Sequence, residues 1–137
     1  MAKTFHGSCI CGSVRFEADL DLAAGTTRCN CSFCRKSRIW FALAKGGAFR
    51  LLAGAELLTD FQRVTSAHPR SYLHFLFCSR CGARAFTRGG EGAGDFHAVN
   101  LGCLDDATDA ELAAAPIHYA DGRHDAWDQD AKETHYL

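Results

Sequence analysis

The sequence predicts a mainly β protein made of short strands, with one short helix near its C-terminal end. Three observations predict this: apolar and polar residues alternate in short segments, turn residues separate those segments, and only one segment carries clear helix-start signals. The chain has 137 residues, of which 47% are hydrophobic. This length and composition suit a single domain, residues 1–137, around one core.

The strands are expected in chain order. In residues 13–20, apolar side chains from Val14 onward alternate with charged ones, as in a half-buried strand. Residues 39–54 read as two strands broken at Gly46-Gly47, which predicts a hairpin. Further strands are expected at 56–64, 71–78, 83–90 and 95–105. The glycine-rich residues 88–95 lack the Lys-Ser/Thr pair of a phosphate-binding loop, so they predict a hairpin turn.

The helix is expected at residues 106–115. Thr108 is its N-cap, Glu111 completes a capping box three residues later, and Pro116 ends it. A short helical turn is also expected after Cys34, in residues 35–38.

Charge and hydropathy exclude several classes of partner. The formal net charge is -1, without the basic footprint of a nucleic-acid-binding protein. No apolar run approaches the roughly 20 residues of a membrane-spanning helix. The first residues lack the apolar core of a signal peptide, so we expect a cytoplasmic protein with no nucleic-acid or membrane partner.

Eight cysteines are present, and seven of them are clustered. The clusters are Cys9 and Cys11; Cys29, Cys31 and Cys34; and Cys78 and Cys81. In a reducing compartment, clustered cysteines favour metal binding over disulfides. The common ferredoxin spacings of iron–sulfur proteins are not matched, so zinc is the expected metal.

Two cysteine pairs predict a structural zinc site. Side chains at i and i+2 of an extended strand share a face, so Cys9 and Cys11 are expected to reach one ion. Cys78 and Cys81 form a Cys-x-x-Cys knuckle, and Gly82 supplies the backbone freedom of such a turn, as Gly12 is expected to do after Cys11. Two thiolate pairs complete a four-sulfur site. Other four-sulfur combinations remain open at this point.

The remaining three clustered cysteines, Cys29, Cys31 and Cys34, leave one position of a tetrahedral metal open. Three protein ligands with an open position are typical of catalytic zinc, and three thiolates suit a soft ligand such as a thiol. The alternative is a closed structural site completed by Cys103 or by a histidine. We expect Cys103 to be a small buried residue on a strand, and His97 is the histidine best placed to reach a site.

Basic and aromatic residues follow the triplet directly. Arg35, Lys36 and Arg38 are expected to bind the carboxylates of an anionic thiol substrate, or to form a solvated turn. Trp40 and Phe41 are candidates for a pocket wall, with the core as the alternative for at least one of them.

The motifs "GSCICGSVRFE" (7–17), "CNCSFCRKS" (29–37), "FCSRCGARAF" (77–86) and "VNLGCLDD" (99–106) occur in this order. Together they resemble the glutathione-dependent formaldehyde-activating family, also called the Gfa or centromere-protein-V domain family, over about Phe5 to Tyr119. The one departure is Ile10, where the family often has histidine.

The resemblance implies small stacked antiparallel sheets of the zinc-binding beta-tent type. It implies a structural zinc on Cys9, Cys11, Cys78 and Cys81. It also implies a second zinc, open or labile at its fourth position, on Cys29, Cys31 and Cys34, with glutathione bound nearby.

Two functions are therefore expected as alternatives. The first is zinc-dependent addition of glutathione, or a related thiol, to formaldehyde or a small aldehyde, the carbon–sulfur lyase chemistry of S-(hydroxymethyl)glutathione synthase. The second is a non-catalytic, zinc-stabilised module that binds glutathione or a protein partner.

Overall fold

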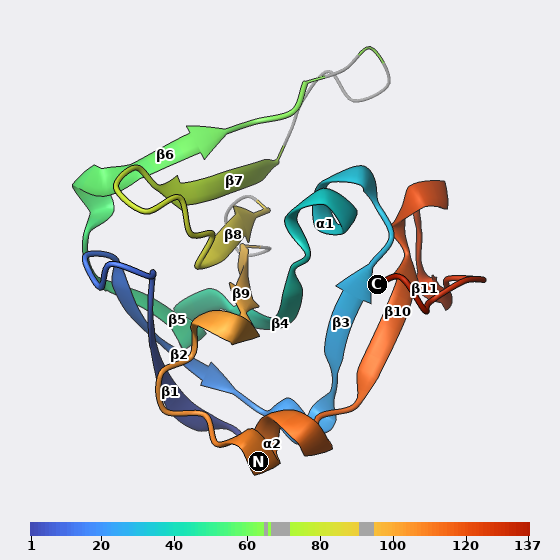
Figure 1. Cartoon of the computed structure of the whole chain (residues 1–137), viewed down its shortest axis with the longest axis horizontal. Coiled ribbons are helices and arrows are strands. Elements are labelled where there is room, and N and C mark those ends of the chain that lie inside the picture. Colours follow the sequence, from blue (N-terminus) through green and yellow to red (C-terminus); the bar gives the residue numbers. More distant parts are fainter. Residues whose placement is uncertain (65, 67–71, 91–94) are drawn as a thin grey trace.

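The structure is a computed structural model, and it describes residues 1–64, 66, 72–90 and 95–137. Over these residues the fold is mainly β, with two sheets and two short α-helices, arranged as in Figure 1. Within the described residues, no helix has the length and apolar character needed to cross a bilayer.

The smaller sheet is antiparallel and has the strand order β1–β2–β5. Its strands are β1 (Lys3–Ser8), β2 (Arg15–Leu20) and β5 (Phe49–Ala53). Alternation on β2 is confirmed: Phe16 and Ala18 are fully buried, as is Val14 just before the strand.

The larger sheet has eight strands in the order β11–β10–β3–β4–β9–β8–β7–β6. Its strands are β3 (Thr26–Cys29), β4 (Trp40–Lys45), β6 (Leu58–Phe61), β7 (Leu73–Cys78), β8 (Phe86–Gly89), β9 (Phe96–Asn100), β10 (Ile117–Asp121) and β11 (Ala126–Asp130). Most neighbours are antiparallel, but β3 and β10 run parallel and lie side by side in Figure 1. The parallel pair joins residues about ninety positions apart and brings the C-terminal strands to the cysteine triplet.

The helices are short. The α-helices are α1 (Ser32–Ser37) and α2 (Asp109–Ala114). Single 3-10 turns are η1 (Leu22–Ala24), η2 (Gly46–Ala48), η3 (Ala55–Leu57), η5 (Leu101–Cys103) and η6 (Gly122–His124). The predicted helix near the C-terminal end is confirmed as α2, with Thr108 as N-cap and the capping box to Glu111 formed.

The main core lies between the two sheets. Phe16 and Phe49 come from the smaller sheet, and their ring centroids are 5.4 Å apart. Phe86 on β8 of the larger sheet meets Phe49 at 4.6 Å. Aromatic pairs at these separations add stabilisation beyond area burial, so these rings tie the sheets together.

A second, smaller apolar cluster lies under α1. It consists of Phe33, Ile39 and Phe75, with Cys31 and Cys34 packed against it. The Phe33 and Phe75 rings stack with centroids 3.8 Å apart. This cluster joins α1 to β7. The helical turn expected after Cys34 is found, but α1 begins earlier, at Ser32, and contains Cys34.

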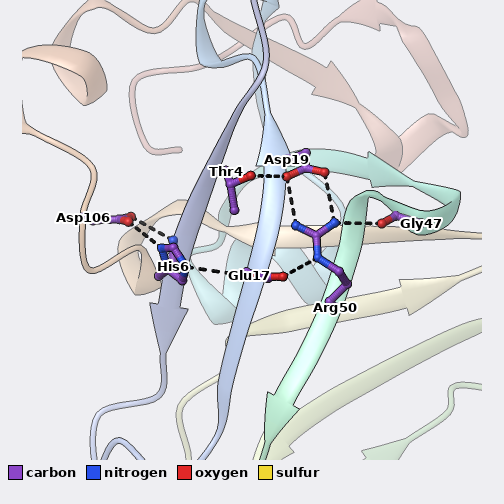
Figure 2. Close-up of polar contacts among 7 residues, drawn as sticks. All are labelled: Thr4, His6, Glu17, Asp19, Gly47, Arg50 and Asp106. Atoms are coloured by element: carbon purple, nitrogen blue, oxygen red, sulfur yellow. Dashed lines mark hydrogen bonds and ion pairs between the residues drawn. The ribbon is translucent and has the colours of Figure 1, made fainter.

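The outer face of the smaller sheet carries a polar network (Figure 2). The Arg50 guanidinium donates to both Asp19 carboxylate oxygens at 3.0 Å and to Glu17 at 2.5 Å. His6 lies between Glu17 and Asp106, and its Nδ1 is 2.9 Å from the Asp106 carboxylate. The network links all three strands of this sheet to the segment before α2.

The hairpin predicted at Gly46-Gly47 is wrong. The two strands exist, but β4 pairs with β3 and β9, whereas β5 pairs with β2 in the other sheet. The η2 turn, with Gly46 at φ +55°, redirects the chain from one sheet to the other.

Other strand predictions are confirmed with shorter bounds. The one expected at 95–105 ends at Asn100, where the Asn100 side chain caps η5. Two expectations reach outside the described residues: the strand expected from residue 71 is described only from Leu73, and positions 91–94 of the expected glycine-rich turn are not described.

Candidate metal centres

Four cysteines from two distant turns come together at one edge of the fold. The Sγ atoms of Cys9, Cys11, Cys78 and Cys81 all lie within 4.8 Å of one another. The Cys9–Cys11 and Cys11–Cys78 sulfur separations are 3.6 and 3.8 Å. A tetrahedron with Zn–S bonds of about 2.3 Å has S···S edges of about 3.8 Å, so this donor set fits a zinc-sized ion.

The expectation that Cys9 and Cys11 share one face of an extended strand is wrong. Strand β1 ends at Ser8, and the two cysteines lie in the turn between β1 and β2. The Cys9 N–H bonds the Val14 carbonyl at 3.0 Å, and the Gly12 N–H bonds the Cys9 carbonyl at 3.1 Å. A tight turn, not strand periodicity, makes the sulfurs converge.

The second turn follows the same plan. The Cys78 N–H bonds the Ala83 carbonyl at 3.0 Å, and the Gly82 N–H bonds the Cys78 carbonyl at 2.8 Å. Gly12 and Gly82 both have φ +76°, the left-handed conformation that glycine adopts without strain. The roles predicted for both glycines are therefore confirmed.

Hydrogen-bond donors lie beside the sulfurs of the first turn. The Val14 N–H donates to the Cys9 Sγ at 3.3 Å. Hydrogen bonds from Ser13 lower the pKa of Cys11 to about 6. Metal ligands must be deprotonated, so these donors prepare the turn for a cation.

The second group is the triplet Cys29, Cys31 and Cys34, whose Sγ atoms also lie within 4.8 Å of one another. Cys29 ends β3, and Cys31 is the N-cap of α1. The Cys31 N–H donates to the Cys29 Sγ at 3.2 Å, and the Cys34 N–H donates to the Cys31 Sγ at 3.4 Å. One helix start thus supplies the convergence that two turns supply in the first group.

The triplet does not carry three equivalent thiols. Hydrogen bonds from Cys29 and then Cys34 lower the pKa of Cys31 to about 2. The hydrogen bond to Cys31 raises the pKa of Cys29 to about 11, and hydrogen bonds to Cys29 and Cys31 raise the pKa of Cys34. The three thiols therefore differ in how readily they ionise, and a soft divalent cation at the triplet would favour the thiolate form of all three.

A small open pocket adjoins the triplet. It is lined by Arg28, Cys29, Cys34, Arg35, Arg38, Ile39 and Leu137. Its free volume is about 10 Å³, which is about the room of one water molecule. Arg35 and Arg38, two of the three predicted substrate-binding residues, are in this lining. Lys36 is exposed and outside it.

Tyr136 lies over these arginines. The Arg38 Nη1 donates to the Tyr136 carbonyl at 2.5 Å, and the Arg35 guanidinium lies 5.4 Å from the centre of the Tyr136 ring. Arg123 donates to the Tyr136 hydroxyl at 3.3 Å. In this structure the arginines therefore have partners from the chain itself.

Other candidates lie elsewhere. In the described part of the chain, neither Cys103 nor a histidine joins the triplet. Cys103 lies in the η5 turn, half-buried rather than on a strand, and burial raises its pKa to about 11. The His97 ring stacks on Phe49 at 4.0 Å, and burial lowers its pKa. Trp40 packs against the main core and Phe41 against the cluster under α1.

Three residues beside the triplet were not predicted from the sequence. Arg28 lines the pocket, Asn30 is buried between two of the cysteines, and Gly122 lies against Cys29. Arg28 precedes the cysteine run directly, so the basic residues on both sides of the run could have pointed to it. Gly122 depends on the β3–β10 pairing, which no local pattern reveals.

Two comparisons with known proteins found relatives of this chain. A crystal structure of a Rhodobacter sphaeroides protein, a structural-genomics target, is similar with a TM-score of 0.64 and 29% sequence identity; the match covers 82% of this chain and 98% of that one. A family model described as glutathione-dependent formaldehyde-activating enzyme matches residues 4–121. Because that match spans most of the sequence, the chain belongs to the glutathione-dependent formaldehyde-activating family.

Proposed function

We propose that this protein adds glutathione, or a related anionic thiol, to formaldehyde or a small aldehyde. The single observation that carries the proposal is the pocket in which Cys29 and Cys34 lie beside Arg28, Arg35 and Arg38. Soft metal ligands and fixed cations in one pocket match a molecule that carries both a thiol and carboxylates. The family membership supports the same chemistry.

Zinc is the metal that we propose for both cysteine groups, structural at the four-cysteine group and exchangeable at the triplet. The donor sets support this, because four thiolates close a tetrahedral site and three leave a position for a ligand. When bound at the triplet, zinc would supply a lowered pKa for a coordinated thiol.

The chain's own residues would bind and orient the thiol. Guanidinium groups bind carboxylates by paired, charge-assisted hydrogen bonds, so Arg35 and Arg38 would hold the carboxylates of glutathione and Arg28 would add charge at the pocket wall. In the reaction, the sulfur forms a bond to the carbonyl carbon, the C=O π bond breaks, and the thiol proton ends on the oxygen. The product is an S-hydroxyalkyl thioether, and no oxidant or reductant is needed.

Rate acceleration would come mainly from concentrating and orienting the reactants, because an oriented pair reacts with a high effective molarity. The test measures exchange between free and thiol-bound formaldehyde by NMR, with zinc-loaded protein. We expect exchange faster than in buffer. Exchange at the buffer rate with fully loaded protein would contradict the proposal for this substrate pair.

A matched pair of variants tests the role of the arginines. We expect Arg35→Ala to weaken glutathione binding by about tenfold, the loss of one charge-assisted hydrogen bond. Lys36→Ala is the control, because Lys36 is the adjacent cation on the same helix but lies outside the pocket. Equal effects of the two substitutions would show that only net charge matters.

A second candidate function is a zinc-stabilised binding module without turnover. The contacts of Tyr136 with Arg35 and Arg38, and the small volume of the pocket, favour it. Glutathione affinity measured by calorimetry, with no effect on the exchange rate, is the result expected of this module.

A further inference from the structure

The turn between β10 and β11 packs directly behind the cysteine triplet. Cys29 on β3 is level with Ala120 on β10 in the parallel pair. The Asn30 N–H bonds the Ala120 carbonyl at 3.2 Å, which continues the pairing past the end of β3. Residues 121–123 therefore meet the peptide that joins Cys29 to Cys31.

Asn30 is held by this turn on both sides of its amide. It is 5% exposed. Its Nδ2 donates to the Asp121 carboxylate at 2.9 Å, and its Oδ1 accepts from the Arg123 N–H at 2.8 Å. A buried amide with both ends bonded fixes its own side chain, and here it also fixes the backbone between two cysteines.

Because Gly122 has no side chain, the Cys29 sulfur can pack directly against its backbone. A Cβ at residue 122 would lie 2.5 Å from the Cys29 Sγ and 2.6 Å from the Trp127 ring. Real Cβ atoms do not approach that closely, so any side chain at residue 122 would displace the sulfur or the turn. The backbone of Gly122 does not have a positive φ, so the constraint is contact with Cys29 and not conformation.

We infer that Asn30, Asp121 and Gly122 are positioning residues for the triplet: they hold Cys29 and Cys31 where a metal ion at the triplet can engage both sulfurs. The inference rests on the part of the proposed function in which the triplet holds a metal. Groups behind metal ligands set the orientation of those ligands, and their loss typically lowers metal affinity about 10–100-fold.

The same contacts give the triplet a closed side and an open side. Gly122 covers Cys29 on the side of the turn, whereas Cys29 and Cys34 line the pocket with the arginines. A fourth ligand therefore reaches the triplet from the pocket of Arg28, Arg35 and Arg38.

The test compares zinc retention at the two cysteine groups within one molecule. Full-length wild type, Gly122→Ala and Asn30→Ala are loaded with zinc and titrated with a chelating dye. In both variants, we expect the zinc at the triplet to be lost at a chelator concentration about 10–100-fold lower than in wild type. The zinc at the four-cysteine group should be retained as in wild type. Gly47→Ala is the matched control, because a Cβ there meets nothing within 4 Å.

Two substitutions of Asp121 distinguish a positioning role from a general loss of stability. Asp121→Asn keeps an oxygen acceptor for the Asn30 amide, so we expect wild-type zinc retention, whereas Asp121→Leu should behave like Asn30→Ala. Cobalt loaded in place of zinc gives a second readout, since its thiolate absorption bands should shift in Gly122→Ala.

Unchanged retention in Gly122→Ala and Asn30→Ala would overturn the inference, as would equal loosening of both zinc ions. A wild-type chain that holds no metal at the triplet would overturn it together with the proposed function. If the wild type holds two zinc ions but does not accelerate formaldehyde exchange, only the proposed function fails.

Discussion

The two cysteine groups reach similar sulfur separations by different routes. The four-cysteine group joins two turns, each ending in a glycine at φ +76°, from segments 67 residues apart. The triplet comes from six consecutive residues around one helix start. The first group therefore forms only when the fold brings the two segments together. The three cysteines of the triplet are close in the sequence, so little tertiary structure is needed to bring them together. Tertiary structure instead determines which residues face the open position of the triplet.

The largest expected effect comes from removing a ligand of each group. Cys78→Ser should abolish cooperative folding, because structural zinc contributes binding free energy directly to folding. Cys31→Ser should remain folded with one zinc fewer. The measurement is zinc per chain together with thermal unfolding, with two zinc ions expected in the loaded wild type. If both variants unfold alike, the two groups do not differ in the way proposed here.

Gly7→Ala, in the smaller sheet, should have the next largest effect, which is on the free energy of unfolding. A Cβ at Gly7 would lie 2.2 Å from the Phe16 ring and 2.7 Å from the Cys103 carbonyl oxygen. Overpacking of this kind costs about 1–3 kcal/mol. Denaturant unfolding should show this loss while zinc at the triplet is retained, which is the reverse of the pattern expected for Gly122→Ala. Gly47→Ala again serves as control.

Arg50→Ala should have a smaller effect, also confined to the smaller sheet. Arg50 pairs with Asp19 and Glu17 across two strands, and its side chain is 37% exposed. We expect a small loss in the free energy of unfolding, because exposed ion pairs contribute little even where, as at Asp19, the contact is bidentate. Arg15→Ala, at an exposed position of the same sheet, should cost less. Equal losses would show that the network adds nothing specific.

The smallest effect concerns His6 and pH. The hydrogen bond that the His6 ring donates to the Asp106 carboxylate raises the pKa of His6 from its ordinary value of 6.5. A raised pKa means that the protonated form stabilises the fold below pH 6.5, and that this contribution is lost as pH rises through the folded-state pKa. His6→Gln should therefore lower the thermal midpoint at pH 5.5 and leave the midpoint at pH 8.5 nearly unchanged. His135→Gln, at an exposed position outside the network, should leave both midpoints unchanged.

Local patterns predicted local structure well. The capping box at Thr108 and Glu111, the burial of Phe16 and the glycine turns after both cysteine pairs all follow from a few adjacent residues. Sheet membership does not, because the η2 turn at Gly46 can either close a hairpin or pass the chain to another sheet. The outcome depends on whether β2 or β4 offers the better partner for β5.

The candidate site divides in the same way. The cysteines that could hold metal ions and the neighbouring arginines are visible as spacing and composition in the sequence. Asn30 and Gly122 gain their importance from β10, which pairs in parallel with β3 from about ninety residues away. A buried asparagine and a glycine in a turn have many ordinary explanations until the structure shows which sulfur they face.

The separation of Cys11 from Cys78 also has a consequence for biosynthesis. A chain is delivered from its N-terminus, so all three thiols of the triplet are available once residue 34 has been made. The four-cysteine group cannot close before residue 81. During that interval the Cys9–Cys11 turn has two thiols and no partner pair, so in the proposed two-zinc protein the triplet can be loaded before the four-cysteine group.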